Sequence, residues 1–104
     1  MDMEATVMEL IINAGESRSL AMQALQAARK GVWQDVDRLM QDAADAAKRA
    51  HDVQTMLIGM DEGCGNVPVN LILVHAQDHI MTSMLARELI AELIEVQRQL
   101  QHRT

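Results

Sequence analysis

The chain has 104 residues, of which 9 are basic and 15 are acidic, so its formal net charge is −6 at pH 7. This length predicts one domain, residues 1–104, with a modest core. Hydrophobic residues make up 49% of the chain, too many for a disordered segment, and Trp33 is its only Phe, Trp or Tyr. The acidic charge and the lack of rings that could stack on bases argue against nucleic-acid binding.

The N-terminal residues, the apolar runs and the cysteine content bear on the cellular compartment. Asp2 and Glu4 stand where a secretory signal would carry basic residues. The longest uninterrupted apolar run, Leu71–Val74, is far too short to cross a bilayer. Cys64 is the only cysteine, which excludes an internal disulfide and fits a reducing compartment. We therefore expect a soluble, cytoplasmic protein without direct membrane insertion.

Apolar residues recur every three to four positions, which predicts three helices separated at two places. The first helix should end at Lys30, because a basic last turn followed by Gly31 is typical of a helix C-terminus. The second break, residues 63–68, holds two glycines and the only proline, and Pro68 suits the first turn of a third helix that reaches about Gln101. The periodic positions of the first two helices are Val7, Met8, Ile11, Ala14, Ala21, Met22, Leu25 and Ala28, then Val36, Leu39, Met40, Ala43, Ala47, Ala50, Val53, Leu57 and Met60.

Gly15 lies inside the first predicted helix. A glycine in a helix interior costs about 1 kcal/mol relative to alanine, so its presence needs a reason. We expect a close helix–helix contact at Gly15 rather than a kink with a function.

The third predicted helix is apolar on two faces. A helix of this kind must bury both faces, and the first two helices can cover only one of them. The simplest cover for the other face is the same helix of another copy of the chain. The sequence thus predicts an all-α, three-helix antiparallel bundle that forms a homo-oligomer. One face holds Leu71, Val74, Asp78, Met81, Leu85, Leu89 and Val96, and the other holds Ile72, Ile90 and Ile94.

The residues that could carry chemistry are His75, Asp78 and His79 on this third helix. The two histidines are four positions apart and are therefore neighbours on one helical face, while Asp78 lies within an apolar stripe. A polar group that sets the register of the helices, a metal site and a nucleophilic histidine are all compatible with this spacing. The zincin pattern requires Glu at position 76, which is Ala, and no histidine has the Glu three residues earlier that a di-iron bundle uses.

The stretch from His75 to Leu85, HAQDHIMTSML, resembles the signature of the lactose/cellobiose family of enzyme IIA. These proteins are components of the bacterial sugar phosphotransferase system (PTS). The continuation 86–90, ARELI, is especially similar to the diacetylchitobiose and cellobiose members. The resemblance covers nearly the whole chain, and its further blocks are Ile11-Ile12-Asn13-Ala14-Gly15, Arg18-Ser19-Leu20 and Ala50-His51 with Gln54-Thr55.

The resemblance implies a homotrimer in which the third helices form the central coiled coil. It implies that His75 is phosphorylated by the histidine-containing phosphocarrier protein HPr and passes the phosphoryl group to a cysteine of the IIB component. The chain would then be a phosphotransferase component in the uptake of a chitobiose-, cellobiose- or lactose-type oligosaccharide. Asp78 matches the family aspartate near the threefold axis, which implies one structural Mg²⁺ per trimer. The alternative is a non-catalytic oligomeric helical scaffold with a His/Asp metal site.

Neighbouring polar residues receive supporting roles. His79, one turn beyond His75, can donate a hydrogen bond to the phosphoryl group or hold the tautomer of His75. Gln77 projects away from His75, so we expect a structural role for it.

The second helix holds two further expectations. His51, Gln54 and Thr55 are predicted to form a buried polar bridge to the third helix. Most members of the family have Asp and an aromatic residue where this chain has Val32 and Trp33, so the second helix should start nearer Asp35.

Overall fold

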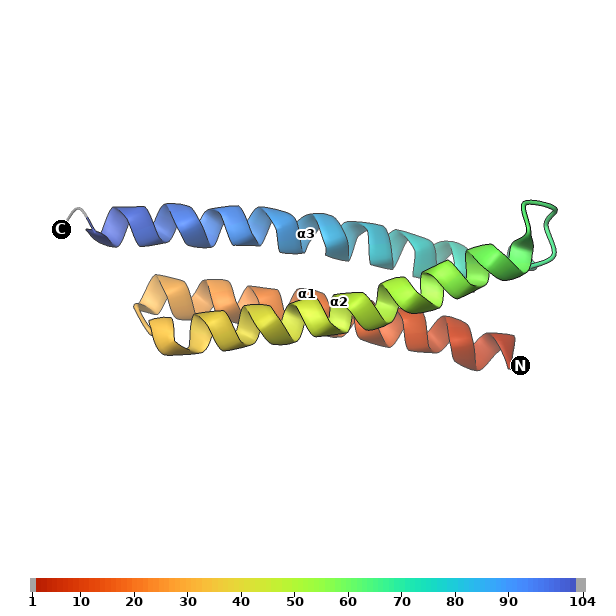
Figure 1. Cartoon of the computed structure of the whole chain (residues 1–104), viewed down its shortest axis with the longest axis horizontal. Coiled ribbons are helices and arrows are strands. Elements are labelled where there is room, and N and C mark those ends of the chain that lie inside the picture. The colour runs from red at the N-terminus through yellow and green to blue at the C-terminus, as the bar shows by residue number, and fades with distance from the viewer. Residues whose placement is uncertain (1, 103–104) are drawn as a thin grey trace.

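A computed structural model describes residues 2–102, and every regular element in this range is a helix. α1 spans Met3–Lys30, α2 spans Trp33–Asp61 and α3 spans Leu71–His102. Each helix runs antiparallel to the one before it, and together they form a rod of 56 × 20 × 19 Å (Figure 1). The predicted all-α, three-helix antiparallel bundle is confirmed. None of the three helices combines the length and the apolar character that a bilayer crossing requires.

The turn between α1 and α2 confirms the predicted end of the first helix and corrects the predicted start of the second. α1 ends at Lys30, and Gly31 adopts the left-handed conformation with φ of 78°. α2 starts at Trp33, so the expected shift of its start toward Asp35 is wrong. The side chain of Val32 makes no capping bond. Trp33 is instead held by α3, because its indole N–H donates to the side chain of Gln101 and the Arg98 guanidinium lies 4.5 Å from its ring centroid.

The start of α3 also differs from the prediction. Pro68 precedes the helix, which begins at Leu71. The side-chain oxygen of Asn70 accepts the backbone N–H of Leu73 at 3.0 Å, which is the bond that a capping asparagine makes. The cap at Asn70 therefore sets the start of α3, and Pro68 belongs to the connecting loop. The helix ends at His102, one residue beyond the predicted end.

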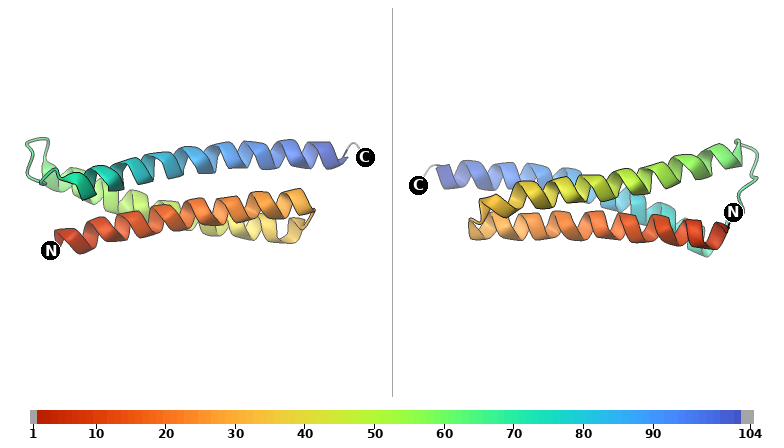
Figure 2. Two further views of the ribbon diagram at one scale, coloured as in Figure 1. Left: turned by 180° about the vertical axis from the view of Figure 1, so that it is seen from behind. Right: turned by 60° about the horizontal axis from the view of Figure 1, so that its bottom comes forward.

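α1 is the central element of the bundle, because it packs along both other helices whereas α2 and α3 touch each other little (Figure 2). Many of its buried residues are alanines, which allow helix axes to approach closely. Two apolar clusters form the core, one toward each end of the rod. The cluster nearer the 62–70 loop includes Leu10, Ala14, Leu57, Leu73, Ala76 and Ile80. The other includes Ala21, Ala24, Ala28, Val36, Ala43, Ile90 and Ile94.

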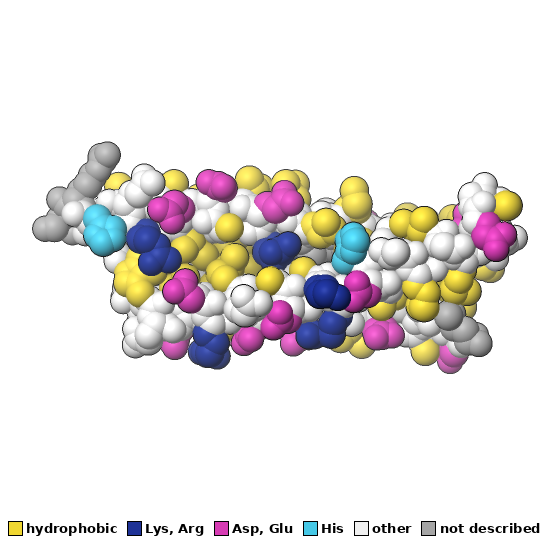
Figure 3. Space-filling view, in the orientation of Figure 1, with side chains coloured by type: hydrophobic (Ala, Val, Ile, Leu, Met, Phe, Trp, Pro, Cys, Tyr) yellow, Lys and Arg dark blue, Asp and Glu magenta, His cyan; other side chains and the backbone are white. Residues whose placement is uncertain are grey.

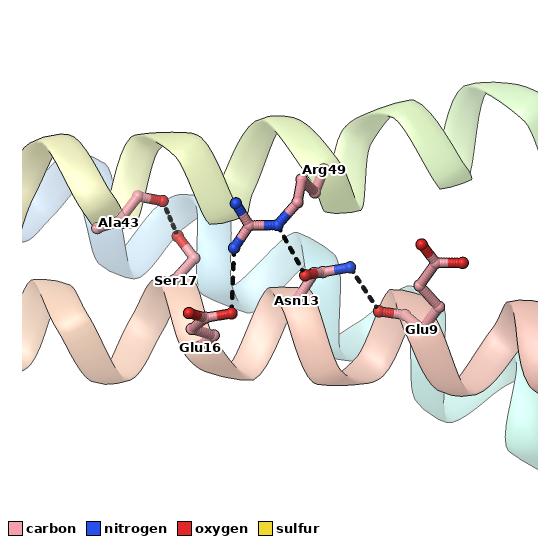
Figure 4. A network of polar contacts seen from close by, with 6 residues as sticks. All are labelled: Glu9, Asn13, Glu16, Ser17, Ala43 and Arg49. Atoms are coloured by element: carbon pink, nitrogen blue, oxygen red, sulfur yellow. Dashed lines mark hydrogen bonds and ion pairs between the residues drawn. The ribbon is translucent and has the colours of Figure 1, made fainter.

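A polar layer between the two clusters joins α1 to α2 (Figure 4). The hydroxyl of Ser17, which is 2% exposed, donates to the carbonyl oxygen of Ala43 at 2.8 Å. The Arg49 guanidinium donates to Asn13 Oδ1 and to Glu16 Oε2, both at 3.1 Å. These directional bonds fix the register of α1 on α2 at the level of Gly15.

The two apolar faces of α3 differ in burial within the single chain. The face with Ile90 and Ile94 is the one buried against α1, but Ile72 is 40% exposed and does not belong to that face. The other stripe is uncovered, and its apolar side chains are between 51% and 85% exposed. Figure 3 shows hydrophobic side chains along the upper edge of the molecule, where α3 runs. We call this stripe the outer face of α3; its apolar members are Leu71, Val74, Met81, Leu85, Leu89, Leu93, Val96 and Leu100.

Candidate functional site

His75 and His79 of α3 form a stacked pair at the border of the outer face. Their ring centroids are 5.7 Å apart and their planes differ by 15°. His75 is exposed, whereas His79 is partly buried. The predicted juxtaposition on one helical face is confirmed, and it presents one imidazole to solvent with a second imidazole behind it.

His79 lies against α1 at Gly15. A Cβ atom added to Gly15 would lie only 3.1 Å from Nε2 of His79. The predicted close contact at Gly15 is therefore confirmed. The sequence did not identify His79 as the residue that Gly15 contacts, because the two positions are far apart along the chain and no local pattern links them.

The surroundings of His79 lower its pKa. Burial is the largest cause, since it disfavours the charged imidazolium, and the positive charge of Arg18 is the next. His75 acts in the same direction, while the Asp78 carboxylate acts against them. His79 is therefore held as a neutral imidazole near pH 7, with one ring N–H as donor and one bare nitrogen as acceptor.

Asp78 lies on the outer face of α3 and is exposed in the single chain. Its neighbours on the same face of the helix, one or two turns away, are the exposed apolar residues Val74, Met81 and Leu85. Within residues 2–102, no three His, Cys, Asp or Glu side chains gather into a group that could hold a metal ion.

The polar bridge between α2 and α3 consists of Gln54 and Gln77. Their side-chain amides donate to each other, and the bond from Gln77 Nε2 to Gln54 Oε1 is 2.7 Å long. The structural role expected for Gln77 is confirmed, as is the bridging role of Gln54. The expectation is wrong for His51 and Thr55, which are exposed because their side of α2 faces solvent.

The sequence of the chain matches a known protein family. The family described as the lactose/cellobiose-specific IIA subunit of the PTS matches residues 5–98. The chain belongs to this family. The resemblance read from the motif is thus confirmed, and as a IIA subunit the chain is a phosphotransfer component of the PTS.

Individual IIA proteins match over most of their length. The chain is 52% identical over 99 residues to the N,N'-diacetylchitobiose-specific EIIA component of Escherichia coli (strain K12), covering 95% of this chain and 85% of that protein. It is 38% identical over 95 residues to the lichenan-specific IIA component of Bacillus subtilis (strain 168), covering 91% and 86%.

Solved structures of IIA proteins share the fold. The cellobiose-specific enzyme IIA of Bacillus anthracis superposes with a TM-score of 0.94 at 36% identity, covering 100% of this chain and 95% of that one. The IIA subunit in the solution structure of the IIA(chitobiose)–HPr complex of Escherichia coli superposes with a TM-score of 0.84 at 50% identity, covering 97% and 98%.

The lowered pKa of His79 predicts a pH dependence of stability. In the range between its folded value and 6.5, the unfolded chain binds more protons than the folded chain, so stability falls as pH falls. Thermal melts from about pH 7.5 to about pH 5.5 should show a larger loss of Tm for the wild type than for His79→Gln. Arg18→Gln removes the second cause of the shift and should reduce the loss. Identical pH profiles for the wild type and His79→Gln would contradict this assignment.

Proposed function

We propose that the chain carries a phosphoryl group on His75, accepting it from phospho-HPr and passing it to a cysteine of a IIB component during oligosaccharide uptake. The observation that carries the proposal is the stacked, solvent-facing His75–His79 pair on α3, inside a chain of the IIA family. We place the reaction in the cytoplasm, a reducing compartment that suits the exposed, unpaired Cys64.

The residues suit a transfer from histidine to histidine. A bare ring nitrogen of His75 attacks the phosphorus of the donor phosphohistidine, whose other ring nitrogen carries a proton, and the donor P–N bond breaks with its electron pair returning to the donor ring. The donor leaves as an imidazole with one N–H, and His75 keeps its own N–H beside the new P–N bond, so the step requires no net proton transfer. In the second step a thiolate attacks the phosphorus and the electron pair of the P–N bond returns to His75. In-line positioning and stabilisation of the phosphoryl oxygens are what the protein must supply.

His79 is proposed as the supporting residue. Its ring stacks one helical turn from His75, within reach of a phosphoryl group attached there. As a neutral imidazole it offers one N–H to a phosphoryl oxygen, or to the ring of His75 in order to hold its tautomer.

The proposed partners and sugar class come from the relatives. The chitobiose IIA subunit, solved in a complex with HPr, is 50% identical to this chain. The E. coli relative at 52% identity is specific for N,N'-diacetylchitobiose, which makes a chitobiose- or cellobiose-type oligosaccharide the best-supported cargo of the system. We propose the same donor protein and the same class of sugar here.

We further propose that the chain works as a homotrimer with α3 at its centre. The outer face of α3 presents eight apolar side chains that are each at least half exposed in the single chain. Soluble proteins rarely leave a contiguous apolar stripe of this length in water, and a second copy of the same helix is a self-complementary cover. The number three follows from the family resemblance rather than from the stripe.

Asp78 fits a structural Mg²⁺ in such a trimer. Magnesium prefers carboxylate oxygens, and three copies of this exposed carboxylate would converge among apolar side chains, where like charges repel. The bound ion would neutralise the converging charges. No step of the transfer passes through it. In the alternative function, a scaffold with a His/Asp metal site, the same carboxylate would have no connection to phosphoryl chemistry.

Replacing the nucleophile tests the proposed chemistry. His75→Gln should fold normally and accept no phosphoryl group, because the glutamine amide is not nucleophilic. Incubation with enzyme I, HPr and phosphoenolpyruvate, followed by detection of acid-labile phosphate, measures the outcome. His51→Gln, which changes an exposed histidine of α2, is the matched control and should be phosphorylated like the wild type. Undiminished phosphorylation of His75→Gln would reject the assignment.

Replacing the carboxylate tests the trimer axis. Asp78→Leu removes the repulsion and adds apolar surface, so it should keep or raise stability, by about 1–4 kcal/mol as for other buried charges. Its melting temperature should no longer respond to Mg²⁺ or chelator, and His75 should still be phosphorylated. Asp42→Leu, at an exposed position of α2, should gain no more than about 0.5 kcal/mol from helix propensity. A markedly destabilised Asp78→Leu protein would contradict the axial position.

A further inference from the structure

We propose that Gly15 is a positioning residue for phosphoryl transfer: the absence of a side chain at this position forms a slot on α1 that holds the imidazole of His79 beside His75. This inference rests on the proposed function of the His75–His79 pair. Gly15 lies on α1 rather than on α3, and it has no side chain that could take part in the reaction.

The space beside Gly15 is occupied by one side chain. A Cβ atom at this position would meet Nε2 of His79 at 3.1 Å and Cε1 of His79 at 4.0 Å, and these two are the heavy atoms that it would meet within 4 Å outside its own stretch of helix. A contact of 3.1 Å is shorter than carbon and nitrogen atoms normally adopt, so the imidazole would have to move by a few tenths of an ångström or rotate. A methyl group at position 15 therefore acts on the ring of His79.

His79 is confined on both sides. One side of its ring stacks on His75, with 5.7 Å between centroids. On the other side its edge lies against the bare backbone of Gly15. Because α1 is tied to α2 by Ser17 and Arg49 close by, the helix cannot easily retreat from an added methyl group. The displacement would fall on the imidazole.

Such a displacement matters for the chemistry. A hydrogen bond from His79 to a phosphoryl oxygen requires a narrow range of distance and angle. Rates of group transfer fall steeply when a positioning group is misplaced by a fraction of an ångström to an ångström. A glycine in mid-helix costs stability, so a gain in alignment at the site is a reason for its presence.

The chain offers a matched control for the test. Gly59 also lies inside a helix, α2, and an added Cβ there would meet nothing within 4 Å. Gly15→Ala and Gly59→Ala therefore make the same chemical change inside a helix, with and without the contact to His79.

The experiment uses the full chain and four variants: Gly15→Ala, Gly59→Ala, His79→Ala and the double variant Gly15→Ala/His79→Ala. The first readout is the rate at which phospho-HPr phosphorylates His75. The second, made without any phosphoryl donor, is the NMR position of the ring resonances of His79 and their NOE to the backbone of residue 15.

Gly15→Ala should slow transfer by about tenfold and move the ring resonances of His79, whereas Gly59→Ala should do neither. The double variant should be no slower than His79→Ala alone, because truncation of the imidazole removes the atoms that the methyl group meets. This non-additivity separates positioning of His79 from general packing.

Two results would overturn the inference. One is a Gly15→Ala protein with the rate and the His79 resonances of the wild type. The other is a double variant that performs worse than His79→Ala alone, either slower by the full factor of Gly15→Ala or unfolded where His79→Ala folds, since Gly15 would then act on something other than His79. Failure of the wild type to accept a phosphoryl group would refute the proposed function instead, and the NMR readout would still test the slot.

Discussion

The packing of α1 against one face of α3 is the interaction on which the other features depend. α3 is apolar on two sides, and among the helices of residues 2–102 only α1 packs along it extensively. Small residues of α1 let the two helices approach closely. At Gly15 the backbone of α1 contacts the imidazole of His79. The rotation of α3 that this contact sets decides which residues face the core, the border and the outside.

That rotation gives each polar residue of α3 a different environment. His79 faces α1 and is partly buried, His75 stands at the border in solvent, and Asp78 lies on the outer face among apolar side chains. A nucleophile at this border, the role we propose for His75, would be open to a protein donor and would have a second imidazole behind it. The outer face is left for contacts that a single chain does not make.

Local patterns predicted most of the fold and the composition of the candidate site. Periodicity predicted three helices, Gly31 predicted the end of α1, and the spacing of His75 and His79 predicted that they are neighbours on one helical face. The features that the sequence did not predict correctly depend on contacts between residues far apart in the chain or on competing local hydrogen bonds. Trp33 starts α2 because Gln101 and Arg98 of α3 hold it, and the cap at Asn70 displaces the start of α3 from Pro68. His79 as the partner of Gly15 required the packed helices.

In the proposed trimer the outer face of α3 is covered by copies of the same chain, so that the border carrying His75 becomes a groove between subunits. Sedimentation equilibrium of the wild-type protein over a range of concentrations tests it most directly. We expect one species with three times the mass of the chain. A species with the mass of a single chain throughout that range would contradict the proposed trimer, because the apolar stripe from Leu71 to Leu100 would then be stable in water.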